Sequence, residues 1–206
     1  NGTLDINGNI VLNSGIFTAP GADYSFMIAG NLTYIGSTFN TSNGTVTFDG
    51  SGISILSGNT IFYNFSCITP GKQLVFTKGS TQTISNILTL RGSYVSPIYL
   101  RSSEAGNYWN IVANSIYAGA VYYVDVKDSN NTGTEIIARS STDSGHNFGW
   151  AFSTPTFIWT GETNHDWGTD SNWDQGWVPA SMDVVEIVST INDPILDQNR
   201  TIAMLT

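Results

Sequence analysis

The sequence is poor in cysteine, in cationic side chains and in long apolar runs. Cys67 stands alone, so no disulfide forms within the chain, and its alternating surroundings indicate a small core residue. The seven lysines and arginines are spread along a chain of net charge −9, which excludes the basic face that nucleic acid requires and a polybasic segment for anionic lipid. No apolar run reaches the length that crosses a bilayer, so we expect no membrane insertion.

Helix-forming residues are also scarce. Charged residues make up only 11% of the chain, whereas Thr, Ile, Val, Phe and Tyr, which fit a pleated half-buried surface, are frequent. This composition predicts an almost entirely β protein. The scarcity of cysteine and lysine suits a bacterial-type exported protein, so we expect an extracellular or cell-surface location. Because the chain opens directly on Asn1-Gly2-Thr3-Leu4, within the pattern, we expect a mature or excised piece of something longer.

A short phrase recurs along the chain, in which an apolar residue closes a strand and a small polar corner follows. It is clearest between Thr45 and Ser103, for example where Phe48 precedes Asp49-Gly50-Ser51-Gly52. Corresponding residues of the phrase lie 24 to 31 positions apart and are Phe17, Phe48, Phe76, Leu100, Val126 and Phe152. Such a period is typical of stacked repeat proteins. We predict a right-handed parallel β-helix (β-solenoid) over residues 1–153, with about six rungs and these six residues in one inward column.

The same short strands could instead form β-hairpins, because Asn-Gly and Ser-Gly corners suit tight turns. Hairpins would pair antiparallel within each unit and would give no reason for one phrase to return at near-constant spacing. Stacked rungs predict that return, so the solenoid is favoured.

The texture changes beyond Phe152. Pro155 marks a joint, and four tryptophans follow within nineteen residues. We therefore predict that residues 154–206 are the Trp-rich start of a further β module. The phrase Trp159-Thr160-Gly161, Trp167, Asn172-Trp173, Gly176, Val178-Pro179 and Asp183-Val184-Val185 resembles the opening of modules in bacterial exported β-solenoid surface proteins, the autotransporter-like and adhesin-like repeat proteins. The resemblance implies a right-handed parallel β-helix outside the cell with a structural or adhesive role, and it brings no catalytic residues.

One stretch of this second region has the spacing of a calcium loop. Asp170, Asn172 and Asp174 offer oxygen ligands at alternate positions, so they are candidate calcium ligands. The loop is not an EF-hand, because Ser181 stands where a glutamate would be needed. The alternative is that these side chains bond their own backbone in Asx turns. No other cofactor is expected.

The four tryptophans of this region are candidates for stacking on sugar rings: Trp159, Trp167, Trp173 and Trp177. The favoured alternative is burial, in which the rings plug the end of a stack or the joint between modules. His146 and His165 are too few and too far apart to indicate zinc.

A third group lies on consecutive predicted rungs and consists of Asp125, Asp128, Arg139, Asp143 and His146. Solenoid enzymes that cleave polysaccharides place paired carboxylates with a basic residue on one exposed face. However, Asp128 has the neighbours of a turn residue, and Gly145-His146-Asn147 is only a fragment of the motif in pectin-cleaving solenoids. We predict no catalysis.

The sequence thus predicts a non-catalytic structural protein of a surface layer, filament or adhesin stalk. Its apolar last strand would run into its first turn as if within one pattern, so the expected partners are copies of itself, stacked end to end, or adjacent modules of a longer chain. One alternative is a carbohydrate-binding adhesive module with surface glycans as partners. The other is a polysaccharide-degrading β-helix enzyme.

Overall fold

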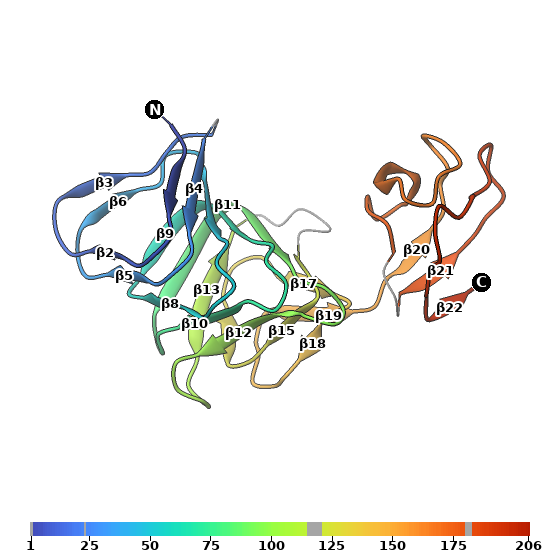
Figure 1. Ribbon diagram of the computed structural model, residues 1–206. Coiled ribbons are helices and arrows are strands. Elements are labelled where there is room, and N and C mark those ends of the chain that lie inside the picture. The colour runs from blue at the N-terminus through green and yellow to red at the C-terminus, as the bar shows by residue number, and fades with distance from the viewer. Residues whose placement is uncertain (1, 23, 115–120, 180–182) are drawn as a thin grey trace. The chain divides into compact units, whose positions relative to one another are not determined.

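The chain divides into two compact units, Asn1–Phe152 (the coil) and Ser153–Thr206 (the tryptophan unit). The structure, a computed structural model, describes residues 2–22, 24–114, 121–179 and 183–206 (Figure 1). Regular structure in these residues is almost entirely β, as the composition predicts, with one short 3-10 helix. No helix among them is long and apolar enough to cross a membrane.

The coil consists of three sheets (Figure 1). The largest has ten strands: β1 (Leu4–Ile6), β4 (Ser25–Ile28), β7 (Thr45–Phe48), β9 (Thr60–Cys67), β11 (Thr81–Arg91), β13 (Trp109–Ala113), β14 (Val121–Tyr122), β16 (Ser129–Asn131), β17 (Ile136–Arg139) and β19 (Trp150–Ser153). The second has seven: β2 (Ile10–Leu12), β5 (Leu32–Tyr34), β8 (Ser54–Ser57), β10 (Gln73–Phe76), β12 (Ile98–Ser102), β15 (Val124–Val126) and β18 (Thr142–Asp143). The third has two: β3 (Ile16–Thr18) and β6 (Thr38–Asn40).

Within the sheets of the coil, strands pair in parallel with counterparts one turn away along the chain. Leu4 lies opposite Phe26 in the first sheet, and Ile10 lies opposite Leu32 in the second. A parallel pair needs a long crossover between its strands, and here the other sides of the turn provide it. The prediction of a parallel β-solenoid is confirmed.

The predicted inward column is wrong in most of its members. Leu100 and Val126 do lie opposite each other. The other assigned residues are distributed over three sheets, since Phe17 pairs with Phe39, Phe48 with Ile28 and Phe76 with Ser102, while Phe152 lies in β19. The main path of the largest sheet also passes through eight strands, so the turns are more numerous and shorter than the six predicted.

The cause of this error is the variable length of the corners. Paired residues are 17 positions apart at Tyr122 and Arg139, but 31 apart at Leu90 and Val121. A corner only has to return the chain to the next rung, and added loop residues change the free energy little. A mean spacing therefore cannot fix the register.

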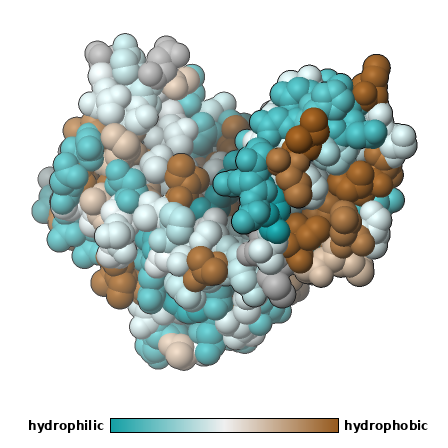
Figure 2. Space-filling view, turned by 45° about the vertical axis from the view of Figure 1, so that its right-hand side comes forward, coloured by the Kyte–Doolittle hydropathy of each residue, from teal (hydrophilic) through white to brown (hydrophobic). Residues whose placement is uncertain are grey.

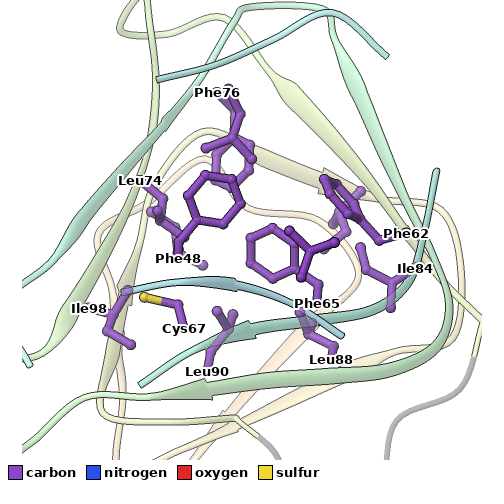
Figure 3. Close-up of a cluster of buried hydrophobic side chains, with 14 of the residues drawn as sticks. Phe48, Phe62, Phe65, Cys67, Leu74, Phe76, Ile84, Leu88, Leu90 and Ile98 are labelled. Atoms are coloured by element: carbon purple, nitrogen blue, oxygen red, sulfur yellow. The ribbon is translucent and has the colours of Figure 1, made fainter. Parts of the chain in front are cut away.

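Inward side chains fill the coil with aliphatic and aromatic layers. Figure 3 shows the roughly triangular outline of the coil with the labelled side chains pointing into it. Phe48 stacks on Phe65 with ring centroids 5.4 Å apart, and Phe76 stacks on Trp109 at 4.0 Å. Cys67 lies fully buried among them, as predicted. Each such burial stabilises the fold by about 1.5–3 kcal/mol.

Asparagines at the corners bind one turn to the next. The Oδ1 of Asn9 accepts a bond of 2.8 Å from the backbone N–H of Asn31, and the Oδ1 of Asn31 accepts one of 2.8 Å from Ile55. Asn59 does the same for Thr81. Backbone N–H groups that a corner leaves without a strand partner are satisfied in this way, which gives the abundance of Asn a structural reason.

The tryptophan unit holds a three-stranded parallel sheet of β20 (Thr156–Ile158), β21 (Val184–Glu186) and β22 (Met204–Leu205), and the 3-10 helix η1 (Asp170–Asn172). Its core combines Phe157 and Val185 with three of the tryptophans. Figure 2 shows apolar side chains gathered on the visible surface of this unit beside a polar stretch. Exposed apolar residues of the unit include Ile191, Ile195, Leu196, Met204 and Leu205.

Candidate functional sites

The predicted calcium ligands Asp170, Asn172 and Asp174 each accept backbone N–H groups of other segments. The Oδ1 of Asp170 accepts the N–H of Val178 at 3.0 Å, and the Oδ1 of Asp174 accepts the N–H of Ile158 at 2.8 Å. These two bonds reach residues 8 and 16 positions away, so Asp170 and Asp174 cap separate backbone segments and are not local Asx turns. Among the described residues, no group of three or more His, Cys, Asp or Glu side chains is placed to hold a metal ion.

Asn172, the third predicted ligand, is fully buried and organises the loop around itself. Its Oδ1 accepts the N–H groups of Thr163 and Asn164 at 2.9 and 3.1 Å. Its Nδ2 donates to the Oδ1 of Asn164 and the carbonyl of Asp166 at 2.8 and 2.9 Å. Because its oxygen and its nitrogen both form hydrogen bonds within the loop, this amide stabilises the loop conformation.

The tryptophans form the core of their unit. Trp159, Trp167 and Trp173 are at most 5% exposed, and Trp173 lies edge-on to both of the others at centroid distances of 5.0 and 4.7 Å. The Nε1 of Trp159 donates to the carbonyl of Asn192 at 2.7 Å. Sugar stacking needs an open ring face, which these three indoles do not have. Trp177 is half-buried against Phe157, with ring centroids 5.8 Å apart.

The acidic group of the later turns is divided among separate partners. Asp125 pairs with Arg101 at 3.0 Å and accepts the hydroxyl of Ser144, while the Oδ1 of Asp143 accepts the N–H of Gly145. The Nη1 of Arg139 donates to the hydroxyl of Tyr122 at 3.2 Å, in the strands β17 and β14.

Asp128 and His146 do meet, at a corner shared by two successive turns. The buried Asp128 carboxylate lies 2.9 Å from the Nδ1 of His146 and accepts the N–H of Gly106 at 3.1 Å. The imidazole stacks on Tyr108 with centroids 4.0 Å apart. Asp128 and His146 both adopt left-handed backbone (φ 57°), a conformation that a sharp corner demands and that costs about 1–3 kcal/mol. The hydrogen bond between Asp128 and His146 and the stacking of His146 on Tyr108 stabilise this corner of the coil.

Lys72 is a buried cation that the sequence did not reveal. Its Nζ donates to the carbonyls of Gly50 and Gly52, one turn earlier, at 2.6 and 3.2 Å. Burial lowers the pKa of this amine, and burial also raises the pKa of the nearby Cys67 thiol to about 11. In the sequence, a Lys in the turn Pro70-Gly71-Lys72 suggests a surface residue, because the carbonyls that bind its ammonium belong to the preceding turn.

The tryptophan unit carries an open cleft of about 400 Å³ lined by Asn164, His165, Asp166, Ile195 and Asp197. The Nδ1 of His165 lies 2.8 Å from the carbonyl of Asp193, to which it donates a hydrogen bond. The bond from Arg200 holds the pKa of Asp197 below its usual value, so the carboxylate stays ionised. The cleft thus offers planar polar groups beside an exposed aliphatic side chain.

No family model, no curated protein and no solved structure matches this chain.

Proposed function

We propose that the chain is a non-catalytic structural unit of an extracellular assembly, such as a surface layer, filament or adhesin stalk, and that it joins further rungs end to end. The observation that carries the proposal is the first turn of the coil. There β1, β2 and β3 are each the outermost strand of their sheet, so three strand edges lie at one end. Such edges are templates for pairing with another chain.

The hydrogen bonds show which backbone groups face outward at this end. The carbonyl of Ile6 accepts the N–H of Ala29, and the N–H of Ile10 donates to Asn31, both at 2.9 Å. Because alternate residues of a parallel strand bond the same neighbour, the backbone groups of Asp5 and Val11 point away from the coil. They are available to a further strand.

The apolar filling of the first turn supports the same reading. Its inward residues Leu4, Ile6, Ile10 and Phe17 pack on the core but are only partly buried. A further rung would cover them, and burial of apolar surface stabilises association by about 25 cal/mol per Å². A further rung would both cover these side chains and pair with the open strand edges, and the two effects together favour linear assembly.

The test is assembly of the purified chain, measured by sedimentation and electron microscopy. We expect concentration-dependent end-to-end oligomers or fibres. Val11→Pro removes an outward N–H without touching the bonds to β5 and should abolish assembly, whereas the matched Val11→Thr should retain it. A monomer across the micromolar range for the unaltered chain would refute end-to-end joining.

The cleft of the tryptophan unit favours a second candidate, a carbohydrate-binding adhesive module. Asn, Asp and His side chains beside an apolar surface suit the hydroxyl groups and the C–H face of a sugar. Calorimetric titration with neutral oligosaccharides tests it. His165→Ala should remove binding, and His146→Ala, which changes the other histidine of the chain, should leave it intact. No heat with any oligosaccharide would dismiss this candidate.

A further inference from the structure

The third side of the coil contains a step between its second and third turns. Thr33 pairs with Ser57, and Thr45 pairs with Asn64. Twelve positions therefore separate Thr33 from Thr45, but only seven separate their partners one turn later. The third turn takes a shorter path, so β6, on the longer path, is displaced from the first half of β9.

The step leaves one edge of β6 without a strand. The sheet of β3 and β6 ends at β6, although β9 follows one turn later, and the first half of β9 pairs only with β11 among the described strands (Figure 1). Thr38 donates its N–H to Gly15, and Asn40 accepts the N–H of Ala19 at 2.8 Å. Since both flanking residues bond toward β3, the backbone N–H and C=O of Phe39 face the step.

A groove of about 300 Å³ occupies the step. It is lined by Tyr34, Phe39, Asn59, Thr60, Ile61, Thr81 and Thr83, none of which carries a charge. Ile61, the second residue of β9, is 60% exposed. An uncharged groove of aromatic, aliphatic and small polar side chains thus runs beside an open backbone edge.

We propose that this groove, here called the step groove, binds an extended, uncharged polypeptide segment of a partner protein, which adds as a third strand to β3 and β6. Strand addition uses main-chain bonds for affinity and alternate side chains for selectivity. The segment would bond the backbone of Phe39 and place an apolar side chain on Ile61, flanked by small polar side chains over Thr81 and Thr83. The site lies on the side of the coil, so it is independent of the joining of coil ends.

The probe is a fluorescein-labelled peptide with the sequence of residues 15–19, which includes β3, the strand that already pairs with the other edge of β6. Fluorescence anisotropy on the full chain should show saturable binding. Ile61→Asp should weaken it by about tenfold or more, because a carboxylate would be desolvated on the floor of the groove. Ile68→Asp is the matched control, since Ile68 is 56% exposed in the turn after β9 and lies outside the groove. It should leave the affinity unchanged.

Amide hydrogen exchange locates the bound peptide. We expect added protection at Phe39, with no change at Asp5 and Val11. Protection at Asp5 or Val11 instead would place the peptide on the coil end and overturn the proposal. It would also be overturned by equal affinities of the Ile61→Asp and Ile68→Asp proteins, or by no binding up to the solubility limit of the peptide. Assembly of the unlabelled chain is measured separately by sedimentation, so failure of the step groove to bind leaves end-to-end joining untouched.

Discussion

The coil and the tryptophan unit both stack strands in parallel, but different interactions hold them together. In the coil, one rung covers the apolar side chains of the next, and the core runs through layers such as Phe48 on Phe65. In its described residues the tryptophan unit has three short strands, and its interior is a cluster of indoles surrounded by side chains that bond the backbone.

The difference shows that stacking alone stabilises a rung only where other rungs cover it on both sides. A rung inside the coil has neighbours on both sides, so aliphatic and aromatic side chains of successive rungs cover one another and close the core. With only three strands, the tryptophan unit cannot close its core by stacking. Large rings and buried amides such as Asn172 stabilise this unit in place of further rungs. Substitution of one of them should therefore destabilise the tryptophan unit without destabilising the coil.

The largest expected effect compares a buried tryptophan from each unit. Trp159→Ala should destabilise the tryptophan unit by about 3–5 kcal/mol, because it leaves a cavity among the indoles. Trp109→Ala should destabilise the coil by a similar amount, since Trp109 is equally buried. Urea unfolding followed by amide exchange in each unit should show each change in its own unit only. Coincident loss in both units would show that they do not unfold separately.

Asn172→Ala tests whether buried amide bonds hold the tryptophan unit in place of a metal. The substitution leaves the N–H groups of Thr163 and Asn164 without their acceptor and should cost about 2–4 kcal/mol. Ser171→Ala, at the exposed neighbour, is the control and should change stability little. Added calcium should leave the unfolding midpoint of the native chain unchanged, and a rise in that midpoint would support the calcium assignment.

The stability of the coil should fall at alkaline pH because the Cys67 thiol is buried away from water. Its pKa is raised from 9.0 to about 11 in the folded chain, mainly by burial. Between these values the unfolded thiol ionises first, so the unfolded state binds fewer protons and stability falls as pH rises. The loss should approach about 2–3 kcal/mol near pH 11.

Cys67→Ala removes the thiol and with it this contribution. Lys72 remains in both proteins, and its lowered pKa acts with the opposite sign, raising stability as pH increases toward the ordinary value of 10.5. Burial is the main cause of that lowering and persists without Cys67, whereas the smaller electrostatic effect of Cys67 on Lys72 is lost. Urea midpoints measured at increasing pH should therefore diverge, with the native chain falling more steeply. Parallel curves would show that the thiol is not desolvated.

The smallest effect belongs to the rim of the coil. Lys78 forms an ion pair with Glu104, and both side chains are about half exposed, at 53% and 54%. Lys78→Ala should change the free energy of unfolding by less than about 1 kcal/mol, since water and salt screen such pairs. A larger loss, measured by urea unfolding, would mean that rim charges contribute to stacking.

The sequence predicted the kind of structure better than its details. Period-two alternation and small polar corners led to a parallel coil, and the cluster of tryptophans marked the second region. The inward column failed because corners differ in length, as at Tyr122–Arg139 and Leu90–Val121. The spacing of Asp170, Asn172 and Asp174 did not predict their backbone partners, because alternate oxygens along a chain do not reveal which backbone N–H groups will lie beside them.

What the sequence alone determined is therefore the preference of each segment: strand, corner or aromatic core. These are local properties of side-chain shape and backbone freedom. The tertiary structure decided the register of the rungs, the burial of Lys72 and the step beside β6. Each depends on how far the chain travels before it meets the previous turn, and residues distant in sequence fix that distance.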